Sequence, residues 1–400
     1  MTTLLAERPT ETTHRRRSMI ALFAAVALMS IAMTGASTAA SLIAAGLGGD
    51  GASGLPNAAG VLGTALGALA AGGLMARHGR RFALLIMYGL ATGGAVIAFD
   101  GALSQTLAPV VAGQLLLGLG NGGAQLSRYL AAELFPASRK GTALAAIVWS
   151  GTVGAIVGPA LISPAAGAAA GRGIPALAGP IAVSALATAC AALATALLPR
   201  GLGPAHRRVR AAARIDAVFR RPAVRLAVTA MAAAHVTMVA VMLMTPVQLH
   251  HHGHGLGVVG WILSAHMLGM FAFAPVSGRI ADRFGGRVAI GAGSAVLVTA
   301  AVLAAVTSST SSLAVALFLL GYGWNLAFVG GSSVLSRDLP EETRIQLQGT
   351  VDAIVWSSAA LASLSAGPLF GIGGYPLLAV LAGLLALLPV GLLVRRPRAI

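Results

Sequence analysis

Three ionisable side chains, Asp352, His235 and Arg128, stand inside long apolar stretches where charge is costly, which makes them candidates for proton coupling. A carboxylate or an imidazole can bind and release a proton within a reaction cycle. Asp352 lies near the end of its stretch, where a structural ion pair is an equally good interpretation. For His235 the alternative is a core histidine whose hydrogen bonds are satisfied inside the protein.

Amide, imidazole and indole groups in the same stretches could bind a small organic molecule. The candidates are Gln114, Asn121, Gln125, His235, Trp324 and Asn325. The first three, together with Arg128, recur at spacings of seven, four and three residues, which places them on one face of a helix. Such a lining suits an amphipathic or weakly polar compound. Hydrogen bonds between helices and aromatic packing are the alternatives.

Other kinds of chemistry find little support in the residue patterns. The run from His250 to His254 could bind zinc or copper, but no carboxylate or thiol accompanies it, so we interpret it as a solvated loop. The sequence contains no Walker-type phosphate-binding loop, and its aromatic residues do not interleave with its basic clusters. We therefore predict no cofactor, no metal site and no nucleic-acid partner. We also expect no enzymatic activity, because no acid, nucleophile or metal set converges.

The composition indicates that these groups are positioned by a bundle of helices in a lipid bilayer. Of the 400 residues, 57% are hydrophobic and only 10% are charged, whereas an ordinary soluble domain has about 25% charged residues. A soluble core cannot absorb this much apolar surface. The 52 glycines fit the same interpretation, because small residues let helices in a membrane approach closely. The chain is predicted to be an all-α integral membrane protein.

Twelve stretches are long and apolar enough to cross a bilayer, which takes about 20 residues. They fall near residues 18–46, 57–76, 82–99, 107–131, 142–163, 175–198, 225–249, 257–278, 288–307, 312–336, 348–370 and 375–394. A basic segment separates the sixth stretch from the seventh. The sequence thus predicts a tail over 1–17, a six-helix bundle over 18–198, a linker over 199–224, a second bundle over 225–394 and a tail over 395–400.

The basic residues give the predicted orientation. Alternate loops carry clusters of arginine, as do both termini, whereas the opposite set of loops holds the single basic residue Arg172. Positive charge is retained on the cytoplasmic side of a membrane. We therefore expect a multi-pass protein of the cell membrane with both termini in the cytoplasm.

The two predicted bundles are copies of one another. A loop motif with Gly72, Arg77, Gly79, Arg80 and Arg81 returns as one with Gly278, Asp282, Arg283, Gly285 and Arg287. The segment Ala-Ile-Val-Trp-Ser at 146–150 returns at 353–357, and Gly158-Pro159 returns as Gly367-Pro368. All these pairs lie 206 to 209 residues apart. The chain is therefore predicted to be a duplication with pseudo-symmetric halves.

These motifs resemble those of the major facilitator superfamily, and the resemblance covers essentially the whole chain. The loop after the second helix matches the family pattern, although Ala76 replaces its acidic residue. Gly154, Gly158 and Pro159 match part of a fifth-helix pattern found in drug/proton antiporters, which then departs at Ile162 and Ser163. The resemblance implies twelve helices around a central cavity, a gating role for the loop motifs, a hinge in the fifth helix, and alternating access.

We therefore expect a secondary active transporter, and we favour proton-coupled efflux of a small organic or drug-like compound. Proton-coupled uptake of a small metabolite is the alternative within the same fold. A membrane-embedded enzyme or a sensor that does not transport are the alternatives of another class. The expected partners are the substrate, the proton and the lipid bilayer, and the chain is expected to act as a monomer.

Overall fold

The computed structural model describes residues 9–133, 140–199, 219–307, 309–338 and 341–394. Within these ranges the description leaves out the side chains of residues 9–14, 76, 128–129, 131–133, 140–145, 148, 336–338, 341–349 and 352–353. The described part of the chain is helical from end to end, apart from short connections.

The described residues of the first half form seven helices and one short 3₁₀ turn. They are α1 (Pro9–Gly48), η1 (Asp50–Ala52), α2 (Leu55–His78), α3 (Arg80–Leu103), α4 (Leu107–Glu133), α5 (Lys140–Ala160), α6 (Ile162–Ala170) and α7 (Ala178–Ala196). Helix α1 begins nine residues before the predicted first span, so residues 9–17 extend the helix instead of forming a separate tail.

The second half forms another set of helices. They are α9 (Pro222–His251), α10 (Leu256–Phe271), α11 (Ala274–Phe284), α12 (Gly286–Val306), α13 (Thr310–Asp338), α14 (Glu341–Ala386) and α15 (Leu388–Val394). Helices α10 and α11 together form one apolar stretch, Leu256–Phe284. Helices α5 and α6 form another, bent by 42° between them.

Helix α14 contains two membrane crossings. Its 46 residues would extend about 69 Å as a straight helix, more than twice the thickness of a bilayer core. Gly373 and Gly374 have non-helical backbone angles, and Gly374 has φ 65°. The break falls between the two predicted spans 348–370 and 375–394. The described residues hold ten apolar helices, with the bent pair as an eleventh, and dividing Ile354–Val394 at the break gives the twelve predicted spans.

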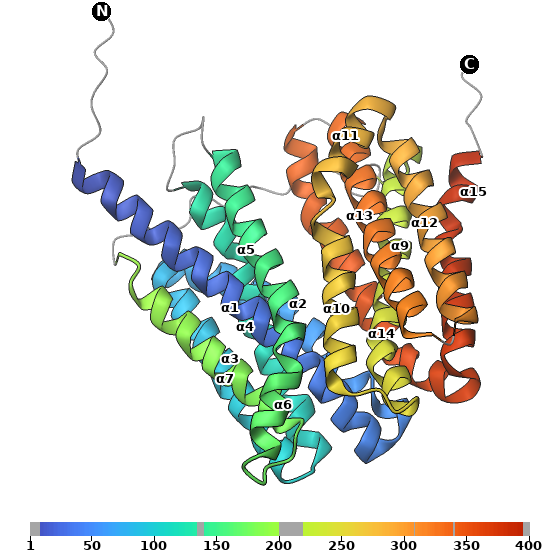
Figure 1. The fold of residues 1–400 in the computed structure, drawn as a ribbon. Helices are drawn as coiled ribbons and strands as arrows, with labels where there is room; N and C mark the ends of the chain where they lie inside the picture. The colour runs from blue at the N-terminus through green and yellow to red at the C-terminus, as the bar shows by residue number, and fades with distance from the viewer. Residues whose placement is uncertain (1–8, 134–139, 200–218, 308, 339–340, 395–400) are drawn as a thin grey trace, which may run out of the picture.

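The helices gather in two bundles, seen in Figure 1 as a blue-to-green half and a yellow-to-red half. In the first, α4 packs against α2 and α3, while α1 packs against α5 and α7. In the second, α13 packs against α10 and α12, while α9 packs against α14. The predicted fold class, two pseudo-symmetric bundles of membrane helices, is confirmed.

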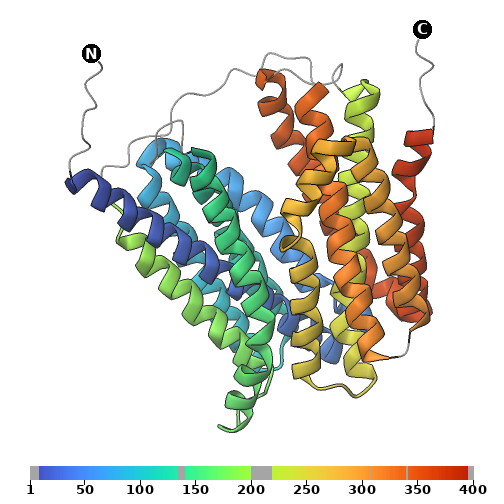
Figure 2. The same cartoon turned by 45° about the horizontal axis from the view of Figure 1, so that its top comes forward.

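The two bundles lean together at one face. The beginning of α1 and the end of α15 lie at the opposite face in Figures 1 and 2, which we call the proximal face. At the other, distal face lie the α1–α2 and α9–α10 connections, and the ribbons of the two bundles converge there. Helix pairs α2–α14 and α5–α10, together with η1 against α14, connect the bundles.

Glycines let the helices within each bundle touch backbone to backbone, and the two bundles do so at equivalent positions. A Cβ atom on Gly63 of α2 would lie 2.1 Å from the Leu115 carbonyl oxygen of α4. A Cβ atom on Gly269, 206 residues later, would lie 2.2 Å from the Phe318 carbonyl oxygen. Close packing of this kind holds helices together where lipid removes the hydrophobic driving force. The duplication is therefore preserved in helix contacts as well as in motifs.

Candidate functional site

The most chemically distinctive contact inside the described helices joins His235 to Trp324. The Trp324 indole Nε1 donates a hydrogen bond of 2.9 Å to His235 Nδ1. His235 lies midway along α9 and is only 5% exposed, and Trp324 lies midway along α13. Two residues predicted to line a substrate cavity are therefore in direct contact at the middle of the second bundle.

Three further aromatic rings surround this pair. The His235 ring lies 5.3 Å from the Trp356 ring of α14 in an edge-on arrangement. The Trp324 ring stacks on Phe328 with centroids 5.0 Å apart and meets Phe271 of α10 edge-on at 6.3 Å. We call His235, Trp324, Trp356, Phe271 and Phe328 the aromatic site. Trp356, Phe271 and Phe328 were not among the predicted site residues.

The repeated segment Ala-Ile-Val-Trp-Ser could have identified Trp356 from the sequence. Trp356 occupies the position in the second copy of Ala-Ile-Val-Trp-Ser that Trp149 holds in the first. Trp149 is 64% exposed on α5, whereas Trp356 is half-buried against His235. Equivalent positions in the two halves thus have different surroundings, and the difference marks Trp356 as the residue of interest.

The hydrogen bond determines which nitrogen of His235 carries its proton. An indole N–H can only donate, so Nδ1 of His235 must offer its lone pair and the ring proton must lie on Nε2. Adding a proton to Nδ1 removes the acceptor and breaks the bond to Trp324. Proton binding at this atom and the present position of the indole N–H are therefore mutually exclusive.

Asn325 faces a different element from its neighbour Trp324. Its Nδ2 donates a 2.7 Å hydrogen bond to the Met270 carbonyl oxygen, at the end of α10. This carbonyl lies just before residues 272–273, which separate α10 from α11. Asn325 therefore ties α13 to the break in its neighbouring span, while its Oδ1 is buried without a hydrogen-bond partner.

The polar residues predicted to share one face of α4 have two kinds of surroundings. Gln114 is fully buried, and its Oε1 lies 3.6 Å from where a Cβ atom on Gly60 of α2 would be. Asn121 Nδ2 donates to Thr64 Oγ1 of α2 at 3.2 Å. Gln125 is exposed. The structure therefore places Gln114 and Asn121 at the α2–α4 contact, apart from the aromatic site.

Two of the predicted proton-coupling residues cannot be placed in this way. The side chains of Arg128 and Asp352 lie outside the described residues. His235 is thus the one predicted coupling residue whose contacts the structure gives.

The two motifs predicted to act in gating form nearly identical turns. Gly79 has φ 83° and ψ 164°, and Gly285 has φ 90° and ψ 151°. Each glycine ends one helix and begins the next, and the amide four residues on, at Ala83 or Ala289, donates to its carbonyl at 3.2 Å. These angles are open to glycine and strained for other residues. Gly72 and Gly278 instead lie within helices, where an added Cβ atom would meet open space.

The charged residues of these motifs have diverse surroundings. Arg81 Nη2 donates a 2.8 Å hydrogen bond to the Ala196 carbonyl at the end of α7, where a cation is favoured by the helix dipole. The Arg283 guanidinium lies 5.3 Å from the Phe284 ring centre. Arg77, Asp282 and Arg287 are exposed, and Arg80 is half-buried. Arg81 therefore joins two helices of one bundle.

The predicted hinge residues of the fifth helix lie at contacts on both sides of α5. Gly154 and Gly158 pack against α1, and a Cβ atom on Gly154 would lie 2.1 Å from the Ala27 carbonyl oxygen. The Pro159 carbonyl faces the other bundle, 2.4 Å from where a Cβ atom on Gly260 of α10 would be. The 42° bend lies between Ala160 and Ile162, just after Pro159.

Among the described side chains, polar contacts join the bundles in the distal half of the helices. Asn57 Nδ2 of α2 donates to Ser363 Oγ of α14 at 2.6 Å, and Asn57 Oδ1 accepts from Ser37 of α1 at 2.9 Å. Ser264 Oγ of α10 donates to the Ile156 carbonyl oxygen of α5 at 3.0 Å. Sequence reasoning missed Asn57 and Ser363, because a single amide and a single hydroxyl carry no recognisable pattern.

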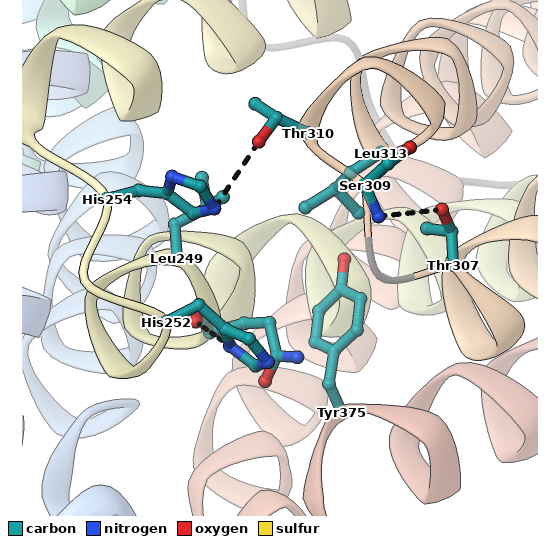
Figure 3. Close-up of a pocket in the computed structure, with 9 residues that line it drawn as sticks. Leu249, His252, His254, Thr307, Ser309, Thr310, Leu313 and Tyr375 are labelled. Carbon is teal, nitrogen blue, oxygen red and sulfur yellow. Dashed lines mark hydrogen bonds between the residues drawn. The ribbon is translucent and has the colours of Figure 1, made fainter.

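The histidine run at the distal face forms separate contacts instead of one cluster. His252 Nδ1 bonds to the Gln248 carbonyl oxygen at 2.9 Å, and His254 Nε2 bonds to Thr310 Oγ1 at 3.3 Å. Both line a small surface pocket with Tyr375, shown in Figure 3. Among the described residues, no three metal-ligating side chains gather at one place.

Comparison with known proteins identifies one family over nearly all of the chain. A family model described as Major Facilitator Superfamily matches residues 21–257 and 226–399. An uncharacterized MFS-type transporter of Bacillus subtilis (strain 168), YdeG, is 32% identical over 87% of this chain and 84% of its own length. The riboflavin transporter RfnT of Brucella anthropi is 27% identical over 78% and 79% of the two chains.

A solved structure shares the fold. The crystal structure of an auto inhibited POT family peptide transporter matches 96% of this chain and 98% of its own with a TM-score of 0.72, at 13% sequence identity. At this identity the likeness concerns the arrangement of helices alone.

Proposed function

Because this chain belongs to the Major Facilitator Superfamily of transmembrane transporters, we propose that it moves a planar aromatic organic compound across the membrane in exchange for protons. The observation that carries this proposal is the hydrogen bond from Trp324 to His235 inside the aromatic site. It joins an aromatic ring directly to a titratable group. We further propose that the proximal face is cytoplasmic, as the basic loops indicate, and that the chain acts as a monomer.

The substrate class is argued from the rings. The centroids of the indole, phenyl and imidazole rings lie 5.0 to 6.3 Å apart. An aromatic substrate could make stacked and edge-on contacts with such rings, and each contact contributes about 0.5–1.5 kcal/mol to binding beyond burial. The Nε2–H group of His235 adds a hydrogen-bond donor, since Nδ1 and the indole N–H are bonded to one another. One relative carries the name riboflavin transporter, and riboflavin is a planar heteroaromatic compound. It is a suitable first probe.

The proposed coupling depends on His235 Nδ1, which can bind either a proton or the indole N–H. A proton on His235 Nδ1 displaces the indole N–H, so Trp324 must turn or find another acceptor. A change at Trp324 reaches Phe328 and Phe271, which touch its ring. Protonation therefore reshapes the surface on which an aromatic substrate would bind. A substrate that needs the present arrangement competes with the proton, which is the requirement for exchange. Asp352 and Arg128 stay candidates for the remainder of the proton path.

The direction of coupling separates our proposal from the alternative, uptake together with a proton. Purified protein would be reconstituted into liposomes, and riboflavin entry would be followed by its fluorescence. Exchange predicts accumulation when the lumen is more acidic than the bath, because proton exit drives substrate entry. Cotransport predicts accumulation when the bath is more acidic. Equal entry under both gradients would reject coupling, and absence of entry would reject this substrate.

Matched variants test the aromatic site. His235→Gln keeps an acceptor for the indole but cannot bind a proton, so we expect riboflavin to equilibrate without responding to the pH gradient. Trp324→Phe keeps a ring but loses the donor, and we expect a response about two- to tenfold weaker, corresponding to the loss of one buried hydrogen bond. Trp261→Phe and His252→Gln are the controls, since Trp261 is 70% exposed on α10 and His252 lies at the distal surface. Unchanged coupling in His235→Gln would remove His235 from the mechanism.

A further inference from the structure

A contact between a histidine and an aspartate joins the two bundles at the distal face. His251, the last residue of α9, has its Nε2 atom 3.2 Å from Oδ1 of Asp50 in η1. The Asp50 side chain is 28% exposed and that of His251 is 45% exposed. Asp50 belongs to the first bundle and His251 to the second, so this contact forms or breaks with the approach of the bundles.

The backbone around Asp50 is held closely against the second bundle. The Asp50 carbonyl oxygen accepts hydrogen bonds from the amide and the hydroxyl of Ser53, and a Cβ atom on Gly367 of α14 would lie 2.7 Å from it. Ser53 Oγ also donates to Met244 Sδ of α9 at 3.4 Å. The His251 ring rests 5.8 Å from the Phe370 ring of α14. Asp50 and His251 are therefore presented to one another by three elements in contact.

We propose that Asp50 and His251 form a proton-dependent latch that holds the distal ends of the two bundles together. Imidazole is the side chain that changes charge between about pH 5 and 8. In acid the pair is a charge-assisted contact and favours the closed distal face. In alkali the imidazole is neutral, the attraction between opposite charges is lost, and the latch weakens.

Few other ionisable groups lie near this pair. His250, His252 and His254 share its segment, and Tyr375 of α14 bonds to Thr245 at 2.9 Å. Asp50 and Tyr375 are the ionisable residues of segments 48–76 and 354–386, which supply the neighbouring parts of α1, η1, α2 and α14. The first turns of α10 add none. The acid in the latch is thus Asp50 alone, and a substitution there isolates its effect from those of the other histidines.

In an exchange cycle, this latch would act on the step that closes the transporter to the outside. If the distal face is extracellular, as proposed above, outside acid favours the state that is closed to the outside. An exporter must make that return step after it has taken up a proton from outside. The latch would then promote the return when the proton supply is high. The latch itself depends on the fold and the ion pair, and it stands whether or not the substrate is aromatic.

The test measures the distance between the bundles at the distal face. The single cysteine would first be replaced by Cys190→Ser. Spin labels would then be attached at Ala176→Cys and Ser311→Cys, two exposed distal positions of the first and second bundles. Double electron–electron resonance in nanodiscs, without substrate, would compare pH 5.5 with pH 8.0. We expect the ratio of short to long distances to be about two- to fivefold higher in acid, as for a partly exposed ion pair.

Variants separate the latch from the proton chemistry of the aromatic site. Asp50→Asn and His251→Gln should each abolish the pH response. Two controls should keep it: Asp100→Asn, at an exposed position near the end of α3, and His252→Gln. The exchanged pair Asp50→His with His251→Asp should restore it, and this variant keeps the test valid if a single variant folds poorly. In a His235→Gln background the response should persist. A wild-type ratio independent of pH, or a full response in Asp50→Asn, would overturn the proposal.

Discussion

At the scale of the residue, the two histidines buried in the second bundle have opposite hydrogen-bonding roles at Nδ1. His266 Nδ1 donates to the Leu317 carbonyl oxygen at 2.8 Å and ties α10 to α13. His235 Nδ1 instead accepts from Trp324. In the first repeat Gly60 takes the position equivalent to His266, and the side chain of Gln114 fills the space beside it. His266 is therefore part of the helix contact, and His235 is the histidine that proton binding would alter.

A residue-scale prediction concerns the turn glycines. Gly285 and Gly278 both face open space, so alanine clashes with nothing at either position. Gly285 has φ 90°, and alanine there should lower the free energy of unfolding by about 1–3 kcal/mol through backbone strain. Gly278→Ala lies within α11 and should be neutral or slightly stabilising. Urea unfolding in detergent, followed by tryptophan fluorescence, would check this. Equal stability of the two variants would contradict it.

At the scale of the element, breaks in the helices lie where the bundles meet or where the site forms. The bend after Pro159 comes at the contact between α5 and α10. The break between α10 and α11 follows Phe271 of the aromatic site and the Met270 carbonyl that Asn325 engages. Carbonyl groups released at such breaks become available to side chains and to other helices.

An element-scale prediction concerns the glycine contacts of the two repeats. Gly63→Ala and Gly269→Ala place a methyl group 2.1 and 2.2 Å from a backbone oxygen of the facing helix, so that helix must move. We expect each to lower stability by about 1–3 kcal/mol, the usual result of overpacking. Gly89→Ala and Gly93→Ala on α3 face open space and serve as controls. Thermal unfolding in detergent would compare the four, and similar melting temperatures throughout would refute the prediction.

At the scale of the whole molecule, the bundles are joined in the distal half by backbone contact and by short polar bonds. Gly54 and Gly367 let η1 and α2 approach the backbone of α14, and Asn57 bonds to Ser363 beside them. Alternating access requires this surface to separate in every cycle, because the site must open to each side in turn. Few charges and small residues suit a surface that must form and part repeatedly.

A whole-molecule prediction follows from the Asn57–Ser363 contact. In Cys190→Ser protein, Asn57→Cys with Ser363→Cys should form a disulfide on oxidation and reduce riboflavin exchange to the background rate, with recovery after reduction. The control is Ser37→Cys with Asn57→Cys, which joins two helices of one bundle that are in contact already. Transport should continue in that variant. Undiminished exchange by protein with the Asn57–Ser363 disulfide would show that this surface need not open.

The sequence by itself determined the number of spans, the duplication and the family. The length of apolar stretches, the charge asymmetry between loops and the repeated motifs are properties of short segments. They can therefore be recognised without knowledge of packing. Even the division of α14 was predictable, because Gly373 and Gly374 fall between two stretches that are each long enough to cross the membrane. A hinge in the fifth span was predicted, but the extension of the fifth and eighth spans beyond 163 and 278 was not.

Only the tertiary structure decided which polar groups meet. His235 and Trp324 are 89 residues apart, and Asn57 and Ser363 are 306 apart. Whether two such side chains touch depends on the rotation and tilt of both helices, which follow from packing along their entire lengths. The same reason explains Gln114 and Asn121, whose spacing predicted a common face but whose neighbours on α2 were set by the glycine contacts of Gly60 and Gly118.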